Sequence, residues 1–210
     1  MKALNLIKFI DKITIICYND YYKKERKQKK MKKGIIFGKF YPLHLGHVNF
    51  IQKCKEKIDK LYIVLCSDEN RDLELFKETD YRLKPTKRIN ILNEEFCNDK
   101  KIEILQLNEN GIAFYPNGWK EWSSAVDKML TEYNINIDVV FTNEIKDVEN
   151  YKKYFKKLQN INDNFEVVST DIDRNEIHIS ATEIRKNPEK NKVFLTPRGK
   201  HYLIFSPLID

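Results

Sequence analysis

The sequence predicts an α/β fold in which helices pack on both faces of a parallel sheet. Two observations predict it. From Gly34 onward, short apolar segments alternate with segments whose apolar residues recur at helical spacing. Each apolar segment is a short run, which is typical of a strand buried inside such a sheet. The alternation is that of a Rossmann-like, doubly wound parallel sheet built as a single domain.

Five apolar segments are predicted to be strands. The first begins at Gly34 and is followed closely by Gly38, and the second has the apolar sequence LYIVLC. The predicted strands are residues 34–39, 61–66, 102–107, 139–142 and 166–169. In open parallel sheets, ligands bind beyond the carboxyl ends of the strands. We therefore expect the functional residues in the loops that follow Lys39, Cys66, Leu107 and Thr142.

Four segments between the strands are predicted to be helices. They are residues 48–58, 85–96, 119–133 and 148–158. The first repeats apolar residues at helical spacing (Val48, Ile51, Ile58), and the second begins with Pro85, which suits the first position of a helix. The third carries an apolar stripe that includes a tryptophan, and the fourth is rich in lysine.

The pattern divides the chain into three parts. Residues 1–33 do not join the alternation and are predicted to be a basic N-terminal arm, with Met31 as an alternative start. Residues 34–187 form the predicted domain. Residues 188–210 contain two internal prolines and are predicted to be an irregular C-terminal extension.

The positive charge of the chain is confined to the arm. The net charge is +7, and the run KKERKQKKMKK from Lys23 to Lys33 holds eight basic residues and one glutamate, which gives +7 by itself. Residues 1–22 add +1, so the residues from Gly34 onward sum to −1. This balance argues against a general basic face for DNA or RNA on the predicted domain. A solvated arm is the favoured interpretation of the run, and nucleic-acid binding is unlikely by comparison.

Cysteine usage and hydropathy indicate the compartment. The four cysteines form no CxxC pair and have no histidine at metal-ligand spacing, so we expect reduced thiols, as in a cytosolic protein. They are Cys17, Cys54, Cys66 and Cys97. No apolar stretch approaches the length of a membrane span, and charged residues interrupt the apolar N-terminus. The sequence predicts a cytoplasmic protein with no membrane partner.

The strongest functional signal is the sequence GKFYPLHLGH, from Gly38 to His47. Here a strand runs through a turn into a helix that begins near Gly46. We expect His44 and His47 at the helix N-terminus, where free N–H groups and the helix dipole favour a phosphate. Gly46 lets the backbone approach the ligand closely. A capped helix with two surface histidines is the alternative, but the whole HxGH string after a glycine-ended strand favours a phosphate site.

A second signal is the sequence ISATEIR, residues 179–185. Ser180 and Glu183 form a capping box, which accounts for both of them. It does not account for Thr182 or Arg185. An arginine in the first turn of a helix opposes the helix dipole, so we expect a bound anion nearby. Together with HxGH, this segment is predicted to form the second half of a triphosphate clamp.

These two elements resemble the HxGH and SxTxxR motifs of the nucleotidyltransferase α/β phosphodiesterase superfamily. The segments GKFYPLHLGH, RDLELF, PTKR, LNENGIAFYPNGWKEWS, FTNE and ISATEIRKNP are similar to the adenylyltransferase domain of NadR-type nicotinamide-nucleotide adenylyltransferases. The resemblance covers residues 32–188. It implies a single nucleotidyltransferase domain that joins the AMP moiety of ATP to nicotinamide mononucleotide, giving NAD and pyrophosphate in NAD biosynthesis. No GxxxxGK[ST] sequence is present, so no ribosylnicotinamide kinase activity is expected.

The resemblance also implies roles for individual residues. Catalytic contacts with the phosphates are assigned to His44, His47, Lys39 and Arg185. ATP binding is further assigned to Gly38, Phe40, Gly46, Thr142, Asn143, Ser180 and Thr182. Acceptor binding is assigned to Trp119, Trp122, Arg71, Arg88 and Asn108. Mg²⁺ is expected to accompany ATP, without a metal site formed by the protein.

Some of these assignments have structural alternatives. Trp122 continues the apolar stripe of its predicted helix, so core packing explains it as well as ligand contact does. Trp119 ends a loop, where its flat ring can stack on a cationic pyridinium. Arg71 and Arg88 are either phosphate or ribose contacts or solvated surface charges.

Two other functions stay open at this level. One is the same adenylyl transfer to another phosphorylated acceptor, such as phosphopantetheine or flavin mononucleotide. The other is a non-catalytic NAD-sensing protein, which the intact motifs disfavour. The expected partners are ATP, nicotinamide mononucleotide and NAD as product, and the sequence is compatible with a homo-oligomer.

Overall fold

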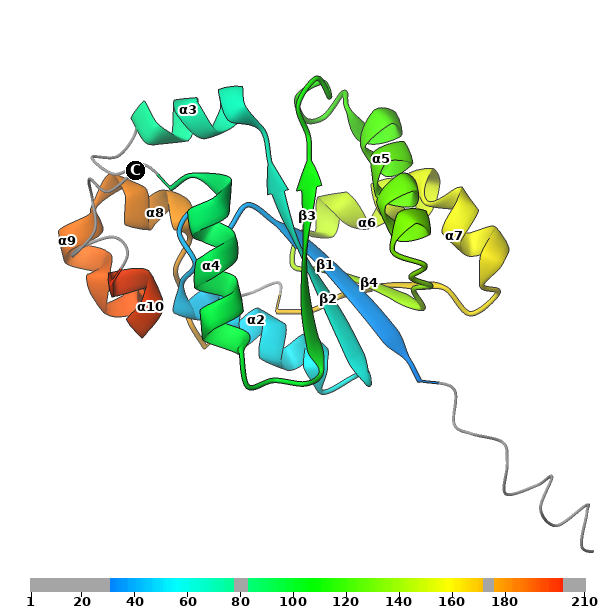
Figure 1. The fold of residues 1–210 in the computed structure, drawn as a ribbon, viewed down its shortest axis with the longest axis horizontal. Coiled ribbons are helices and arrows are strands. Elements are labelled where there is room, and N and C mark those ends of the chain that lie inside the picture. Colours follow the sequence, from blue (N-terminus) through cyan, green and yellow to red (C-terminus); the bar gives the residue numbers. More distant parts are fainter. Residues whose placement is uncertain (1–30, 78–82, 172–175, 202–210) are drawn as a thin grey trace, which may run out of the picture. The chain divides into compact units, whose positions relative to one another are not determined.

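The computed structural model describes residues 31–77, 83–171 and 176–201. Their strands form a sheet of five parallel strands in the order β3-β2-β1-β4-β5 (Figure 1). The strands are β1 (Lys33–Gly38), β2 (Lys60–Ser67), β3 (Ile102–Asn108), β4 (Val139–Thr142) and β5 (Glu166–Ser169). The predicted Rossmann-like, doubly wound α/β fold is confirmed.

The sheet is buried on both faces. Successive residues of a strand face opposite sides of the sheet, and in β1 Ile36 belongs to one apolar core while Ile35 belongs to the other. Residues of β2 alternate between the two cores in the same way. Each fully buried side chain of this size contributes about 1.5–3 kcal/mol. Burial on both faces explains why the strands are apolar runs in the sequence.

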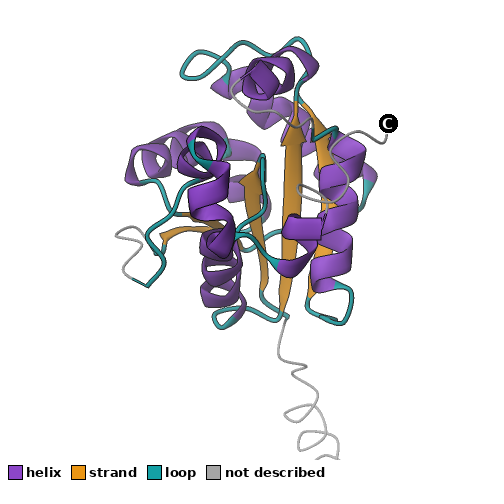
Figure 2. Cartoon of the chain, turned by 90° about the vertical axis from the view of Figure 1, so that its left-hand side faces the viewer, coloured by secondary structure: helices purple, strands orange, loops and turns teal. Residues whose placement is uncertain are grey.

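Helices cover each face (Figures 1 and 2). One core contains residues of α2 (Leu45–Lys55), α4 (Pro85–Phe96) and α8 (Ala181–Lys186). The other core contains residues of α5 (Trp119–Glu132), α6 (Ile145–Tyr154) and α7 (Lys156–Ile161). The predicted helices 85–96 and 119–133 are observed as α4 and α5 with almost the expected bounds. The predicted helix 48–58 is observed as α2, which begins three residues earlier than expected.

The strand order places a crevice at the carboxyl ends of β1 and β4. The chain moves outward from β1 to β2 and β3 on one side, and β4 and β5 lie on the other side of β1. Ligands of doubly wound sheets bind where the strand order reverses in this way. The residues that follow β1 and β4 are therefore the first place to look for a site.

Two helical segments differ from the sequence prediction. The helix α3 (Glu69–Lys77) was not predicted, because its residues are mostly polar and show no apolar stripe. It begins where the Asp68 carboxylate accepts a hydrogen bond from the backbone N–H of Arg71 at 2.8 Å, which is a capping contact. The predicted helix 148–158 is instead two helices, α6 and α7, which meet at Phe155 with ψ of 43°.

The prediction of an irregular tail is wrong for residues 188–200. They form α9 (Pro188–Asn191), the 3-10 helix η1 (Lys192–Phe194) and α10 (Pro197–Lys200). Prolines here occupy the first position of a helix, where the backbone N–H that proline lacks would have no partner within the helix. The Thr196 side chain, fully buried, accepts from Gly199 N at 3.0 Å. Leu195 forms a backbone bridge with His44, so this segment packs against the turn that carries the histidines.

The predicted N-terminal arm lies almost entirely outside the described residues, and so do residues 202–210. Its last residue, Lys33, already belongs to β1. The backbone N–H of Lys32 donates to the Asp59 carboxylate at 2.9 Å. Among the described residues, no helix combines the length and the apolar character that crossing a bilayer requires.

Candidate active site

The turn after β1 carries the two histidines. His44 is the N-cap residue of α2, and its Nδ1 accepts a hydrogen bond from the backbone N–H of His47 at 3.3 Å. Because Nδ1 accepts, the proton of the neutral His44 ring is on Nε2, which can donate. The two rings stack with centroids 3.7 Å apart and planes at 27°. The predicted placement of both histidines at the start of a helix is confirmed.

Two buried arginines donate hydrogen bonds to backbone carbonyls of this turn. Arg88 donates from Nη1 to the carbonyl of Lys39 at 2.8 Å, and Arg185 donates from Nη1 to the carbonyl of Tyr41 at 2.8 Å. Between these carbonyls, Phe40 has a φ of 47°, in the left-handed region. Such a conformation costs on the order of 1–3 kcal/mol for a residue with a side chain. Hydrogen bonds from a charged group contribute about 1.5–3 kcal/mol each, so the two arginines offset the strain of the turn.

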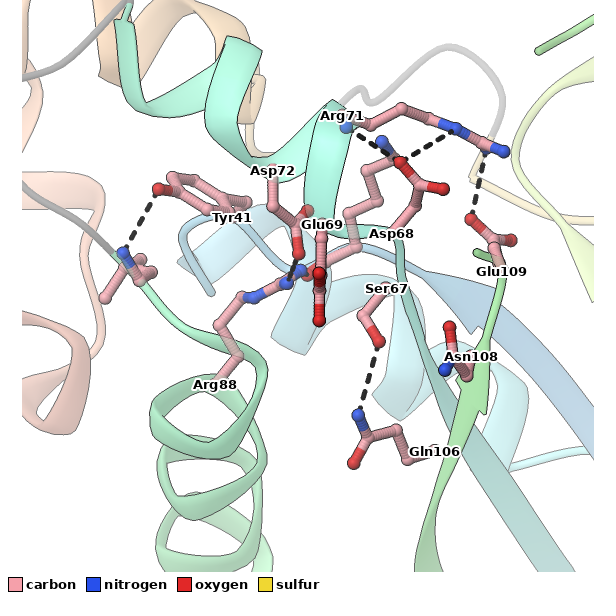
Figure 3. Close-up of polar contacts among 12 residues, drawn as sticks. Tyr41, Ser67, Asp68, Glu69, Arg71, Asp72, Arg88, Gln106, Asn108 and Glu109 are labelled. Carbon is pink, nitrogen blue, oxygen red and sulfur yellow. Dashed lines mark hydrogen bonds and ion pairs between the residues drawn. The ribbon is translucent and has the colours of Figure 1, made fainter. Parts of the chain in front are cut away.

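Arg88 has its own counter-ion. Its side chain is 0% exposed and forms an ion pair with Asp72 of α3 (Figure 3). The guanidinium also lies 5.1 Å from the ring centroid of Tyr41. Desolvation lowers the pKa of Arg88 and raises the pKa of Asp72, and their mutual attraction opposes both shifts. Both sequence interpretations of Arg88, a ligand contact and a solvated charge, differ from what the structure shows, because the side chain is enclosed and paired.

Two glycines permit close approach around the histidines. A Cβ atom on Gly46 would lie 3.0 Å from Nδ1 of His44 and 3.2 Å from Cγ2 of Ile179. A Cβ atom on Gly38 would lie 2.9 Å from the ring of Phe40. Gly46 is therefore needed for space, so that α2 can lie against both His44 and the segment that leads into α8.

A cavity of about 270 Å³ opens at the carboxyl ends of β1 and β4, and we call it the histidine cavity. Both predicted motifs line it. The sequence-predicted residues among its lining are Gly38, Phe40, His44, Gly46, His47, Asn143, Ser180 and Thr182. Two segments far apart in the sequence thus meet at one cavity. Thr142 does not line it: this buried residue accepts a hydrogen bond from Glu144 N at 3.1 Å and shapes the turn after β4.

The start of α8 has the predicted capping box. The Ser180 Oγ accepts from Glu183 N at 3.1 Å, and Ser180 N donates to the Glu183 carboxylate at 2.8 Å. Arg185, however, lies in the last turn of this six-residue helix, where the dipole favours a cation. The expectation that it opposes the dipole is therefore wrong. Besides Tyr41, its guanidinium contacts Thr182, donating from Nη2 to the Thr182 Oγ1 at 3.1 Å.

A second cavity, of about 150 Å³, lies between α5, α6 and the loop after β3. We call it the aromatic cavity. It is lined by Arg71, Glu109, Ile112, Ala113, Tyr115, Gly118, Trp119, Trp122 and Tyr151. Trp119 packs edge-on against Trp122 and Tyr151, with centroids at 5.5 Å and 5.2 Å. Trp122 also packs on the apolar core, so its ring both lines the cavity and continues the stripe of α5.

Glu109 is the polar centre of the aromatic cavity. The residue is 5% exposed. Its Oε1 accepts from the indole N–H of Trp122 at 2.7 Å, and its Oε2 accepts from Nη1 of Arg71 at 3.2 Å. Figure 3 shows Arg71 reaching from α3 to Glu109 at the end of β3. Glu109 lies in the segment LNENGIAFYPNGWKEWS but was not selected from the sequence, because a single glutamate in a loop resembles any solvated charge.

Lys39 lines neither cavity but has neighbours in both. It follows Gly38, which lines the histidine cavity, and the charges that act most on it are Glu109 and Asp72, followed by the two arginines Arg71 and Arg88. Burial lowers the pKa of Lys39 below the usual lysine range, and Glu109 opposes this shift. The ring of Phe37 joins the cavities, because it lines one and packs on Trp122 of the other at 4.7 Å.

Asn108 is not brought to either cavity. Its carboxamide oxygen accepts from Asn110 N at 2.9 Å at the exposed end of β3, so its contact shapes the loop. Conversely, residues that the sequence analysis did not select do line the cavities. They include Glu109, Tyr115 and Tyr151 in the aromatic cavity and Asp171 and Ile177 in the histidine cavity. Asp171 has a φ of 56° and pairs with Lys53 of α2 at 2.7 Å.

Residues 35–187 match the model of the cytidylyltransferase-like family. The chain belongs to this family. As a cytidylyltransferase-like protein it is a nucleotidyltransferase related to NadR and to nicotinamide-nucleotide adenylyltransferases. The family match begins within β1 and ends just after α8, so it contains both segments that meet at the histidine cavity.

Individual relatives agree with this assignment. The cytidylyltransferase-like chain is 33% identical over 173 residues to the trifunctional NAD biosynthesis/regulator protein NadR of Escherichia coli (strain K12), which covers 81% of this chain and 40% of NadR. It is 29% identical over 157 residues to the nicotinamide-nucleotide adenylyltransferase of Archaeoglobus fulgidus, covering 73% and 78% of the two chains. A crystal structure of NadR protein in complex with NAD and AMP-PNP matches with a TM-score of 0.63 at 29% identity, over 82% of this chain and 46% of that one. The chain thus spans less than half the length of these NadR proteins.

Proposed function

We propose that the protein transfers the adenylyl group of ATP to nicotinamide mononucleotide, giving NAD and pyrophosphate. One observation carries the proposal. Two cavities of different chemistry meet at the Phe37 ring near the end of β1, one lined by histidines and one by aromatic rings, and Lys39 follows two residues later in the chain. A two-substrate transfer requires that two ligands meet end to end, with a cation where their phosphates approach.

The histidine cavity suits the nucleotide. The N-terminus of the eleven-residue helix α2 lies at it, with His44 and His47 at that end. Backbone N–H groups at a helix N-terminus bind phosphate, and the two imidazoles add donors. Ser180 and Thr182, at the start of α8, add residues with hydroxyl groups to the lining.

The aromatic cavity suits the acceptor ring. Its indole and phenol rings can contact a flat pyridinium on its faces and edges, and aromatic faces attract a cation. Among the proposed acceptors, nicotinamide mononucleotide carries such a ring, whereas phosphopantetheine does not. The relative whose structure was determined with NAD supports this choice.

The reaction needs no protein nucleophile. An oxygen of the acceptor phosphate attacks the α-phosphorus of ATP in line, a new P–O bond forms, and the bond to the β-phosphate breaks so that pyrophosphate leaves. His44 and His47 donate to the phosphate oxygens on which charge increases, and Lys39 lies between the two negatively charged reactants. Arg185 does not line the cavity and is proposed to act on the β- and γ-phosphates through Thr182, which lines the cavity and accepts a hydrogen bond from Nη2 of Arg185.

Mg²⁺ is proposed to arrive with ATP. Among the described residues, no group of three or more histidine, cysteine, aspartate or glutamate side chains could hold a metal ion. The acidic residues of the histidine cavity are Glu144 and Asp171, and Asp171 is paired with Lys53. Such a site fits an ion that is held mainly by phosphates and waters, and that neutralises phosphate charge when bound. We place this chemistry in cytoplasmic NAD biosynthesis.

The test is an acceptor panel. The purified protein is incubated with ATP, Mg²⁺ and one acceptor at a time: nicotinamide mononucleotide, flavin mononucleotide or phosphopantetheine. Pyrophosphate release is followed. We expect turnover with nicotinamide mononucleotide. Turnover with another acceptor alone would reassign the substrate, and tight binding of NAD with no pyrophosphate release would make the protein an NAD sensor.

A further inference from the structure

We propose that Glu109 selects the charge of the acceptor ring, so that the aromatic cavity admits a pyridine ring with a carboxamide and rejects one with a carboxylate. This inference rests on the proposed function, since it concerns the same acceptor site. It goes further, because it names the residue that distinguishes nicotinamide mononucleotide from nicotinic acid mononucleotide.

The first step is the identity of the charged groups at the cavity. Among the described residues that line it, only Arg71 and Glu109 carry a formal charge. The Glu109 side chain is 7% exposed, so solvent screens it poorly. A ligand ring in this cavity therefore lies close to a poorly screened carboxylate.

The second step is that Arg71 already has partners within the protein. It donates from Nη1 to Glu109 at 3.2 Å and from Nη2 to the carbonyl of Ile112 at 2.9 Å. Its Nε lies 3.7 Å from the Asp68 carboxylate, which is also buried (Figure 3). One cation is thus shared between two carboxylates, and the three groups together carry a charge of −1. A ligand carboxylate would therefore be a third anion beside this one cation.

The third step concerns a second cation, Lys39. It is near Glu109 but does not line the aromatic cavity. In the proposed reaction its charge faces the two phosphate groups. The ring end of the acceptor is then left with an excess of negative charge, which attracts a pyridinium and repels a carboxylate.

The hydrogen-bonding groups point to the same choice. Glu109 offers only acceptor oxygens, whereas the indole N–H of Trp119 is buried and makes no hydrogen bond to another described residue. A carboxamide has both a donor and an acceptor and matches such a pair. A carboxylate has acceptors alone, so facing Glu109 it would meet like charge without a hydrogen bond.

The experiment compares two acceptors in three proteins. For the wild type, Glu109→Gln and Glu103→Gln, kcat/KM is measured with nicotinamide mononucleotide and with nicotinic acid mononucleotide. Glu103 is the matched control, because it is a carboxylate on β3, close in sequence to Glu109, that also forms an ion pair, with Lys60 at 3.1 Å, and it lies outside both cavities.

We expect the wild type to prefer the amide by about 100-fold, as for like charges about 6 Å apart at an effective dielectric constant of about 20. In Glu109→Gln the preference should fall by about tenfold or more, because the charge is lost and Arg71 is released. Glu103→Gln should keep the wild-type preference. Trp122→Phe removes a donor to Glu109 without changing charge, so it should also keep the preference, even if it lowers both rates.

The outcomes separate this inference from the proposed function. A wild type that uses both nucleotides equally, or a Glu109→Gln variant with an unchanged preference, would overturn the role of Glu109 and leave the adenylyl transfer intact. No turnover with either pyridine nucleotide, together with turnover on another acceptor in the panel, would overturn the proposed function itself. Circular dichroism on Glu109→Gln establishes that a changed preference belongs to a folded protein.

Discussion

The histidine cavity and the aromatic cavity both contain residues that neighbour Lys39, but they are built differently. The histidine cavity is lined by the ends of strands and the starts of helices, with histidines, hydroxyls and glycines. The aromatic cavity is lined by large rings around one buried ion pair, Arg71 and Glu109. The first presents donors to an anion, and the second presents π faces and a carboxylate to a ring. Changes on one side should therefore affect one substrate and leave the other largely unaffected.

The largest expected effect is on the histidine side. His47→Ala should lower kcat by about 10²–10³, the loss that follows removal of one donor to a reacting oxyanion. Steady-state pyrophosphate release measures it, and the KM for the acceptor should change little. His178→Ala is the control, because His178 is exposed and lines neither cavity. A fully active His47→Ala protein would contradict the assigned site.

The next largest effect is expected in the aromatic cavity. Trp119→Ala should raise the KM for nicotinamide mononucleotide by about 30-fold, since a desolvated cation–π contact contributes about 2 kcal/mol. The KM for ATP should stay near the wild-type value. Tyr133→Ala, at the exposed C-terminal end of α5, controls for loss of an aromatic residue on the same helix. Equal increases in both KM values would break the separation of the two cavities.

A smaller effect is expected from added bulk on the histidine side. In Gly46→Ala the new Cβ would lie 3.0 Å from His44 Nδ1, so the ring must shift by a few tenths of an ångström. We expect kcat to fall by about tenfold, because small misplacements of catalytic groups are costly. Thermal stability should change little, because the helix preference of alanine over glycine, about 1 kcal/mol, offsets the cost of the crowding. A large loss of Tm would show that Gly46 serves the fold rather than the position of His44.

The smallest effect concerns Lys39, which has neighbours in both cavities. Because burial lowers its pKa, the folded protein loses this proton at a lower pH than the unfolded chain does. Between the two pKa values the unfolded chain binds more protons, so stability rises with pH across this window. Activity should change in the opposite direction, because the cation is lost. Lys39→Arg should remove this alkaline decrease of kcat/KM when profiles from about pH 7 to about pH 10 are compared.

The two cavities also differed in how far the sequence predicted them. The histidine cavity comes from two contiguous motifs whose spacing already specifies a strand end, a turn and a helix start, so His44, His47 and Ser180 were placed correctly. The strands were predicted because burial on both faces makes them apolar runs. Local patterns of this kind are visible without the fold.

The aromatic cavity was visible only in part. Trp119 and Trp122 were selected, but Glu109 and Tyr151 come from other elements, and their contact with the tryptophans is a product of the sheet order. The prediction for Arg88 was wrong for the same reason. Its partner Asp72 lies on α3, a helix that was not predicted because its residues are mostly polar. Side chains that act through partners distant in sequence cannot be assigned from local spacing.

The two guanidinium groups behind the turn after β1 have a kinetic consequence. Arg88 and Arg185 already fix the carbonyls of Lys39 and Tyr41, so the loop that meets the nucleotide has its shape before ATP arrives. A receptor that needs no prior rearrangement binds its ligand in a single step, with an observed rate that rises linearly with ligand concentration. Nucleotide capture by this loop should then be limited by collision and orientation, and not by a slow opening of the protein.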